Sequence, residues 1–165
     1  MSPWEIDAGR LVLLAMMGLC IGSFINVLIV RLPQGMTIMG HSQCPHCRQI
    51  IAWWDLVPVV SYFLLRGQCR RCKARISAQY PIIEFLVMVL VLLSILLLGQ
   101  SLLVSFLIAL ACGLLLAVAV IDWRTQMIPD ALSIAIAAIG VLVTIGSLLP
   151  GITLPSLVVA LQSLA

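Results

Sequence analysis

Residues 11–30 read LVLLAMMGLCIGSFINVLIV, twenty residues without a single charge. A helix rises 1.5 Å per residue, so about 20 apolar residues cross the roughly 30 Å hydrocarbon core of a bilayer. This stretch therefore predicts a membrane-spanning helix. Glu5, Asp7 and Arg10 precede it and no small-residue cleavage site follows it, a pattern that indicates a retained span rather than a secretory signal.

Three further apolar runs follow, at residues 80–98, 101–121 and 131–149. The whole chain is 63% hydrophobic and 9% charged, whereas a soluble domain carries about 25% charged residues. We therefore predict an all-α integral membrane protein with about four transmembrane helices. Its parts are expected to be an N-terminal segment with the first span (1–30), a polar loop (31–79), three spans (80–149) and a short apolar tail (150–165).

The distribution of lysine and arginine predicts the orientation. Residues 31–80 hold seven basic residues and one acid, whereas the first ten residues hold one arginine and two acids. Basic loops remain in the cytoplasm, so loop 31–79 is expected there and the N-terminus outside. By counting spans, the turn at 99–101 lies outside and the stretch 122–130 is cytoplasmic again. A membrane-lipid environment explains these charges, and no motif for nucleic-acid binding accompanies them.

Two CxxC pairs occupy the polar loop, Cys44 with Cys47 and Cys69 with Cys72, and 21 residues separate the pairs. Two such knuckles are typical of a tetrahedral zinc site, and four protein ligands leave no open position, so the zinc would be structural. The alternative, disulfide or redox pairs, is disfavoured in a reducing cytoplasm. His41 and His46 are close to the first knuckle, but four cysteines already suffice.

The loop has about 50 residues and cannot build much of a core by itself. Zinc binding can contribute folding free energy on the order of 10 kcal/mol, so the predicted site is a zinc-ribbon-like module. Its apolar residues either form a small cluster or lie at the membrane surface, and they are Trp53, Trp54, Leu56, Val57, Tyr62 and Phe63.

Ionisable residues within or beside spans are candidates for function. Glu84 is one, although it could instead be solvated at a helix end or pair with Arg75. In the first span, Gly22, Ser23 and Asn26 are expected to pack against another helix and hydrogen-bond to it.

Asp122 ends an uncharged run, where partial desolvation and a neighbouring acid would raise its pKa. Two carboxyl groups that share a proton are what an aspartic protease needs, one to activate water and one to protonate the leaving group. Asp130 follows eight residues later. Its position after Pro129 favours a helix cap over a catalytic role.

These motifs together resemble the bacterial type IV prepilin leader peptidases. The resemblance rests on GSFINVLIVRLP (22–33), CPHC and CRRC, ISAQYPIIEF (76–85) and VIDWRTQMIPD (120–130), in that order. It implies a membrane aspartic endopeptidase of the bacterial inner membrane. Such enzymes cleave the basic leader of type IV prepilins or type II secretion pseudopilins, and many methylate the new N-terminus with S-adenosylmethionine.

By position, the resemblance makes Asp122 the first catalytic aspartate and the four cysteines the family's tetrad, and it places Glu84 in the segment associated with methyl transfer. The family's second aspartate lies in a GxGD motif two spans further on, and this sequence has no charged residue after Asp130. We therefore expect poor cleavage by these residues alone, unless Asp130 substitutes or an oligomer or a GxGD-bearing polypeptide complements them. The alternatives are a non-catalytic adapter that binds pilin or secretion components through its zinc module, and a transporter subunit, for which no inverted repeat is visible.

Overall fold

The computed structural model describes residues 8–98 and 102–148. The tail at 150–165, the turn at 99–101 and residues 1–7 lie outside these described residues. Four long helices form a bundle, namely α1 (Ala8–Arg31), α3 (Gln79–Leu98), α4 (Leu102–Thr125) and α5 (Asp130–Leu148). Three short helical turns occur in the loop between α1 and α3, namely η1 (Leu32–Gln34), η2 (Trp53–Leu56) and α2 (Val60–Leu64). No β-strand occurs within the described ranges, and the all-α class is confirmed.

Three helices are long and apolar enough to cross a membrane. The spans are Leu11–Gln34 in α1, Gln79–Leu96 in α3 and Phe106–Thr125 in α4. The corresponding apolar stretch of α5, Asp130–Ile145, is shorter. Three of the four predicted spans therefore have the length and composition of a transmembrane helix, and the fourth remains a prediction.

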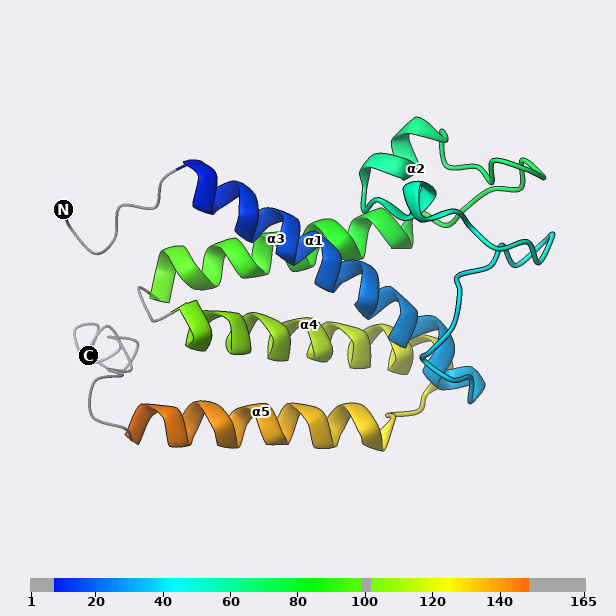
Figure 1. The fold of residues 1–165 in the computed structure, drawn as a ribbon. Coiled ribbons are helices and arrows are strands. Elements are labelled where there is room, and N and C mark those ends of the chain that lie inside the picture. The colour runs from blue at the N-terminus through cyan, green and yellow to red at the C-terminus, as the bar shows by residue number, and fades with distance from the viewer. Residues whose placement is uncertain (1–7, 99–101, 149–165) are drawn as a thin grey trace.

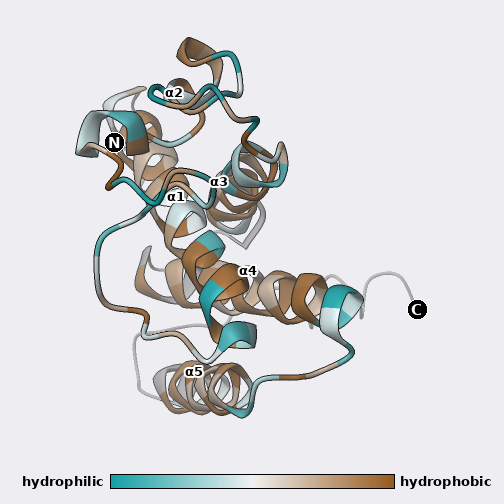
Figure 2. Ribbon diagram, turned by 90° about the vertical axis from the view of Figure 1, so that its right-hand side faces the viewer, coloured by the Kyte–Doolittle hydropathy of each residue, from teal (hydrophilic) through white to brown (hydrophobic). Residues whose placement is uncertain are grey.

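The helices bring both polar regions of the chain to one end of the bundle. The chain runs along α3, α4 and α5 in alternating directions, and α1 crosses in front of α3 and ends near α4 (Figure 1). The loop that contains α2 and the short link between α4 and α5 both lie at the end where α1 stops and α3 begins (Figure 1). Hydrophilic residues gather in this loop and at the helix ends, whereas the helices are mainly hydrophobic (Figure 2). The topology argument predicts this shared end.

The closest packing in the bundle joins α1 to α3. Gly18 and Gly22 are four residues apart on α1, the spacing of the GxxxG motif that lets two helix backbones approach each other. A Cβ atom added at Gly22 would lie 2.6 Å from the Cα of Glu84, and one at Gly18 would lie 2.7 Å from the Cα of Met88. The core continues from this contact through the fully buried side chains of Ile25, Val87, Val91 and Ile121.

Candidate functional site

The two cysteine pairs lie in turns of the same backbone geometry. In the first turn the N–H of Cys44 donates to the carbonyl of Gln49 at 3.0 Å, and the N–H of Arg48 donates to the carbonyl of Cys44 at 2.8 Å. The second turn repeats both bonds, from Cys69 N to Ala74 O at 2.8 Å and from Lys73 N to Cys69 O at 3.1 Å. Arg48 and Lys73 each follow the second cysteine of a pair, and both have a positive φ, 55° and 58°, which closes the turn.

The two turns face each other and bring the four thiols together. The sulfur atoms of Cys44, Cys47, Cys69 and Cys72 all lie within 4.8 Å of one another, and those of Cys44 and Cys72 are 3.7 Å apart. A tetrahedral site with metal–sulfur bonds of about 2.3 Å has sulfur–sulfur edges of about 3.8 Å. The donor set and its spacing therefore fit one tetrahedral metal ion. His41 and His46 are not members of this group.

The backbone of the second turn favours an ionised sulfur. Hydrogen bonds from the N–H groups of Cys72 and Arg71 lower the pKa of the Cys69 thiol to about 6. A backbone hydrogen bond from Ala74 lowers the pKa of the Cys72 thiol, but burial and hydrogen bonds to the other three cysteine sulfurs outweigh it and raise that pKa to about 11. The thiolate is the form that binds metal, so binding an ion here would release the proton that the cysteines share.

An ion pair ties the second cysteine turn to helix η2. Arg70 lies between Cys69 and Cys72, and its Nε and Nη2 atoms donate to the two oxygens of Asp55 at 2.8 and 2.6 Å. The Asp55 carboxylate is only 8% exposed. The hydrogen bonds from Arg70 hold the pKa of the Asp55 carboxyl below its ordinary value. This two-pronged contact orients the metal-binding turn relative to the segment that leads into α2.

Glu84 joins the loop to the helix bundle. It is 7% exposed, covered by α1 at Gly22, and its Oε2 accepts a hydrogen bond of 2.7 Å from the N–H of Val59. Ser23 of α1 is a second hydrogen-bond partner of the carboxylate. The alternative in which Glu84 is solvated at a helix end is therefore wrong, and the partners of its carboxylate that the structure shows are Val59 and Ser23 rather than Arg75. The close approach of α1 shields Glu84 from water, and the loop folds back to reach it.

The backbone at Val59 is strained. Its φ and ψ are 61° and −52°, and the N–H of Val60 donates to the carbonyl of Pro58 at 2.6 Å. These values define the rare γ-turn with positive φ, which is especially unfavourable for a β-branched residue. The turn aims the Val59 N–H at Glu84. No periodicity or motif in the sequence reveals this contact, because it depends on a backbone conformation that valine rarely adopts.

Asn26 makes a second polar contact between α1 and the start of α3. Its Nδ2 donates to the carbonyl of Tyr80 at 3.0 Å, and its Oδ1 accepts from Gln79 Nε2 at 3.3 Å. The expectation that Gly22, Ser23 and Asn26 pack and hydrogen-bond between helices is confirmed.

Asp122 and Asp130 lie on either side of the link between α4 and α5. Asp122 is in the last turn of α4 and is half-buried, as expected for a carboxylate at the end of a span. Asp130 is exposed and is the first residue of α5. The carbonyl of Pro129 accepts from the N–H groups of Leu132 and Ser133, so Pro129 occupies the capping position. The structure thus moves the predicted cap by one residue and leaves Asp130 in the first turn, where the helix dipole favours a negative charge.

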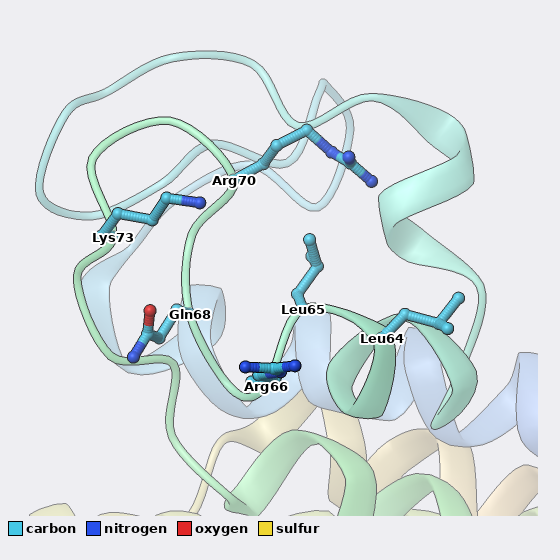
Figure 3. Close-up of a pocket in the computed structure, with 6 residues that line it drawn as sticks. All are labelled: Leu64, Leu65, Arg66, Gln68, Arg70 and Lys73. Atoms are coloured by element: carbon cyan, nitrogen blue, oxygen red, sulfur yellow. The ribbon is translucent and has the colours of Figure 1, made fainter.

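A basic depression of about 390 Å³ lies beside the second cysteine turn. Figure 3 shows the six side chains that line it, namely Leu64, Leu65, Arg66, Gln68, Arg70 and Lys73. In the sequence these cations indicate only the topology of the loop. Their placement around one concave surface depends on the positive φ of Arg66 and Lys73, 53° and 58°.

The fold and the site define a helical protein with three helices long and apolar enough to cross a membrane and with a group of four cysteines that could hold a metal ion at one end of its bundle. Comparison with known families shows that residues 16–98 match the Bacterial Peptidase A24 N-terminal domain. The chain therefore belongs to the prepilin leader peptidase/N-methyltransferase family.

Several relatives carry that name. The chain is 34% identical to the prepilin leader peptidase/N-methyltransferase of Neisseria gonorrhoeae in a match that covers 86% of this chain and 56% of the relative. It is 33% identical to that of Stutzerimonas stutzeri, over 87% of this chain and 59% of the relative. A shorter match to that of Myxococcus xanthus is 43% identical over 76 residues, 46% of this chain and 23% of the relative. The chain thus spans about half the length of the first two relatives, and no solved structure shows a significant match.

Proposed function

We propose that the chain is the N-terminal part of a membrane aspartic endopeptidase that cleaves the basic leader from type IV prepilins or type II secretion pseudopilins. Family membership carries this proposal, together with the position of Asp122 at the same end of the bundle as the four cysteines (Figure 1). Asp122 is one acid of the catalytic pair. The second acid comes from a GxGD segment that these 165 residues do not contain, or from a complementing polypeptide.

The four cysteines hold a structural Zn²⁺ in this proposal. Zinc prefers tetrahedral thiolate sites, and the four sulfur atoms already lie within 4.8 Å of one another. The metal would fix the loop that faces the prepilin leader. The protein lies in the bacterial inner membrane with loop 31–79 and Asp122 on the cytoplasmic side, where basic loops remain.

We propose a second activity for the protein that contains these residues. It methylates the new N-terminus, with S-adenosylmethionine as the donor. Glu84 lies at the junction of the loop and the bundle, within reach of both. Its buried carboxylate is proposed to support that site.

The test measures cleavage of a purified prepilin, which is detected by the faster migration of the product on a gel. We expect poor cleavage by this chain alone and restored cleavage when the GxGD-bearing half of a relative is added. In the restored system Asp122→Asn should abolish cleavage, because an amide cannot take up the proton. Asp130→Asn should weaken it less, by the roughly 0.3–1 kcal/mol of a helix-dipole interaction. Efficient cleavage by the chain alone, with both aspartates essential, would instead make Asp122 and Asp130 the catalytic pair.

The alternative function is a membrane adapter that binds pilin or secretion components without cleaving them. The observation in its favour is that four cysteines able to hold one metal ion lie together in the polar loop. The adapter would be supported over the protease by one result. Prepilin would copurify with the complemented protein, this binding would require the four cysteines, and the prepilin would never be cleaved.

A further inference from the structure

The segment Val59–Leu64 presents an apolar surface that no described part of the protein covers. The side chains of Phe63 and Leu64 are 70% and 78% exposed, and that of Val60 is half exposed. Soluble surfaces rarely leave several large apolar side chains together in the open, and such a patch indicates a contact with a partner or a membrane.

A hydrogen bond determines how deep this segment lies. Val59 donates to Glu84, which is five residues past the start of α3 and therefore about 7.5 Å along its axis. Side chains on a helix lean back toward its N-terminus, so the Val59 amide lies level with the first turns of α3. Those turns belong to a candidate membrane span that begins at Gln79. The strained backbone at Val59 maintains this depth at an energetic cost.

The position of α2 beside the bundle agrees with that depth. In Figure 1, α2 lies alongside the N-terminal end of α3, whereas the cysteine turns extend beyond the helix ends. In Figure 2, α2 lies to the outside of α1 and α3 rather than over the centre of the bundle. A segment placed outside the bundle, and level with the ends of its spans, meets the lipid.

Two basic residues beside this segment complement a bilayer surface. Arg66 lies two residues after the end of α2, and Lys73 lies across the depression that both residues line (Figure 3). Each basic residue near an anionic membrane contributes about 1 kcal/mol of attraction. Trp53 and Trp54 precede α2 and are largely exposed, and tryptophan is enriched at the boundary between lipid and water.

We propose that Val59–Leu64 inserts into the bilayer on the metal-loop side of the bundle. Phe63 and Leu64 lie among the acyl chains, and Arg66 and Lys73 lie at anionic headgroups. The insertion rests on the membrane embedding given under Proposed function. It makes the metal-binding loop a module attached to the membrane at α2 and to α3 through Glu84, instead of a domain tethered only by its two ends.

The experiment measures the depth of single tryptophan reporters in the 165-residue protein. The four native tryptophans are replaced by phenylalanine, and the protein is reconstituted at high lipid ratio into vesicles of phosphatidylglycerol and phosphatidylcholine. Phe63→Trp reports on α2, with Leu64→Trp as an independent second reporter. Phe85→Trp, beside Glu84 on α3, is the control within a span, and Gln49→Trp is the control on a cysteine turn. Stoichiometric zinc in each variant verifies folding.

We expect brominated lipid to quench Phe63→Trp to the same extent as Phe85→Trp, while acrylamide quenches only Gln49→Trp strongly. If acrylamide quenches Phe63→Trp and Leu64→Trp as it quenches Gln49→Trp, the insertion is wrong although the span is right. Protection of both reporters from both quenchers would mean that protein, such as a second copy of the chain, covers α2, and this also overturns the proposal. Failure of brominated lipid to quench Phe85→Trp would refute the membrane embedding itself.

Discussion

The contact between α1 and α3 gives the sharpest test of the packing, through the substitution Gly22→Ala. The added Cβ would lie 2.6 Å from the Cα of Glu84 and 3.1 Å from its carbonyl oxygen. Both are backbone atoms and cannot rotate away. The helices would have to separate by roughly 1 Å to reach normal carbon–carbon contact.

The expected destabilisation has two parts. Overpacking typically costs about 1–3 kcal/mol, and separation of the helices would also lengthen the 2.7 Å bond between Val59 and Glu84, a charged hydrogen bond worth about 1.5–3 kcal/mol. Alanine regains about 1 kcal/mol of helix propensity over glycine. The net loss of stability is therefore on the order of 3 kcal/mol.

Gly140→Ala is the matched control, because a Cβ at Gly140 in α5 would meet no atom within 4 Å. That variant should be slightly more stable than the parent. Gly113→Ala should be intermediate, since its Cβ would clash only with the end of the flexible Ile25 side chain, at 2.5 Å, while the Val87 methyl groups lie at ordinary contact distances of 3.7 and 3.8 Å. The order of stability of the three variants is measured by unfolding them in detergent micelles with added dodecyl sulfate and monitoring helix content by circular dichroism. Equal stability of Gly22→Ala and Gly140→Ala would show that α1 and α3 do not pack as described.

Elemental analysis of the purified protein should find about one zinc per chain, and Cys44→Ser or Cys72→Ser should lose the metal and loosen loop 31–79. Stoichiometric zinc in a variant with all four cysteines replaced would contradict the site. Asp55→Asn should accelerate the release of zinc to a chelator, because Arg70 then loses its anchor. Since the pKa of Asp55 is depressed in the folded protein, its contribution should be complete above its unfolded pKa of about 3.9 and disappear as the pH falls through the lower folded value. A topology reporter fused at Gly67 should behave as cytoplasmic and one at Gln100 as external, and the reverse pattern would invalidate the proposed catalytic face.

Local patterns in the sequence were sufficient for the helices and for the group of four cysteines that could hold a metal ion. Uncharged runs of about 20 residues predict spans because each apolar residue contributes separately to the free energy of transfer from water to lipid, whatever its neighbours in space. The two CxxC pairs predict a tetrahedral site because each pair is closed by a turn of a few residues. Both predictions depend on residues that are close in the chain.

The role of Glu84 could not be predicted in this way. Its partner Val59 is 25 residues away and donates from the backbone, which every residue type carries, so no side-chain pattern identifies it. The backbone conformation of Val59 opposes its intrinsic preference and exists only because tertiary contacts maintain it. The residue that caps α5 could not be predicted either. The cap is Pro129, one residue before Asp130, and sequence patterns locate helix ends only to within a few residues.

The sequence by itself determined that the chain is helical, apolar enough for a membrane, and equipped with four thiols that could hold a metal ion and an aspartate at the end of a candidate span. Only the tertiary structure decided that α1 covers Glu84, that the loop folds back onto α3, and that α2 is left exposed beside the bundle. The physical reason is that these features depend on the close approach of two helix backbones at Gly18 and Gly22. The small-residue motif on α1 indicates a close approach, but which helix it meets, and at which residues, depends on the combined shape of both helices.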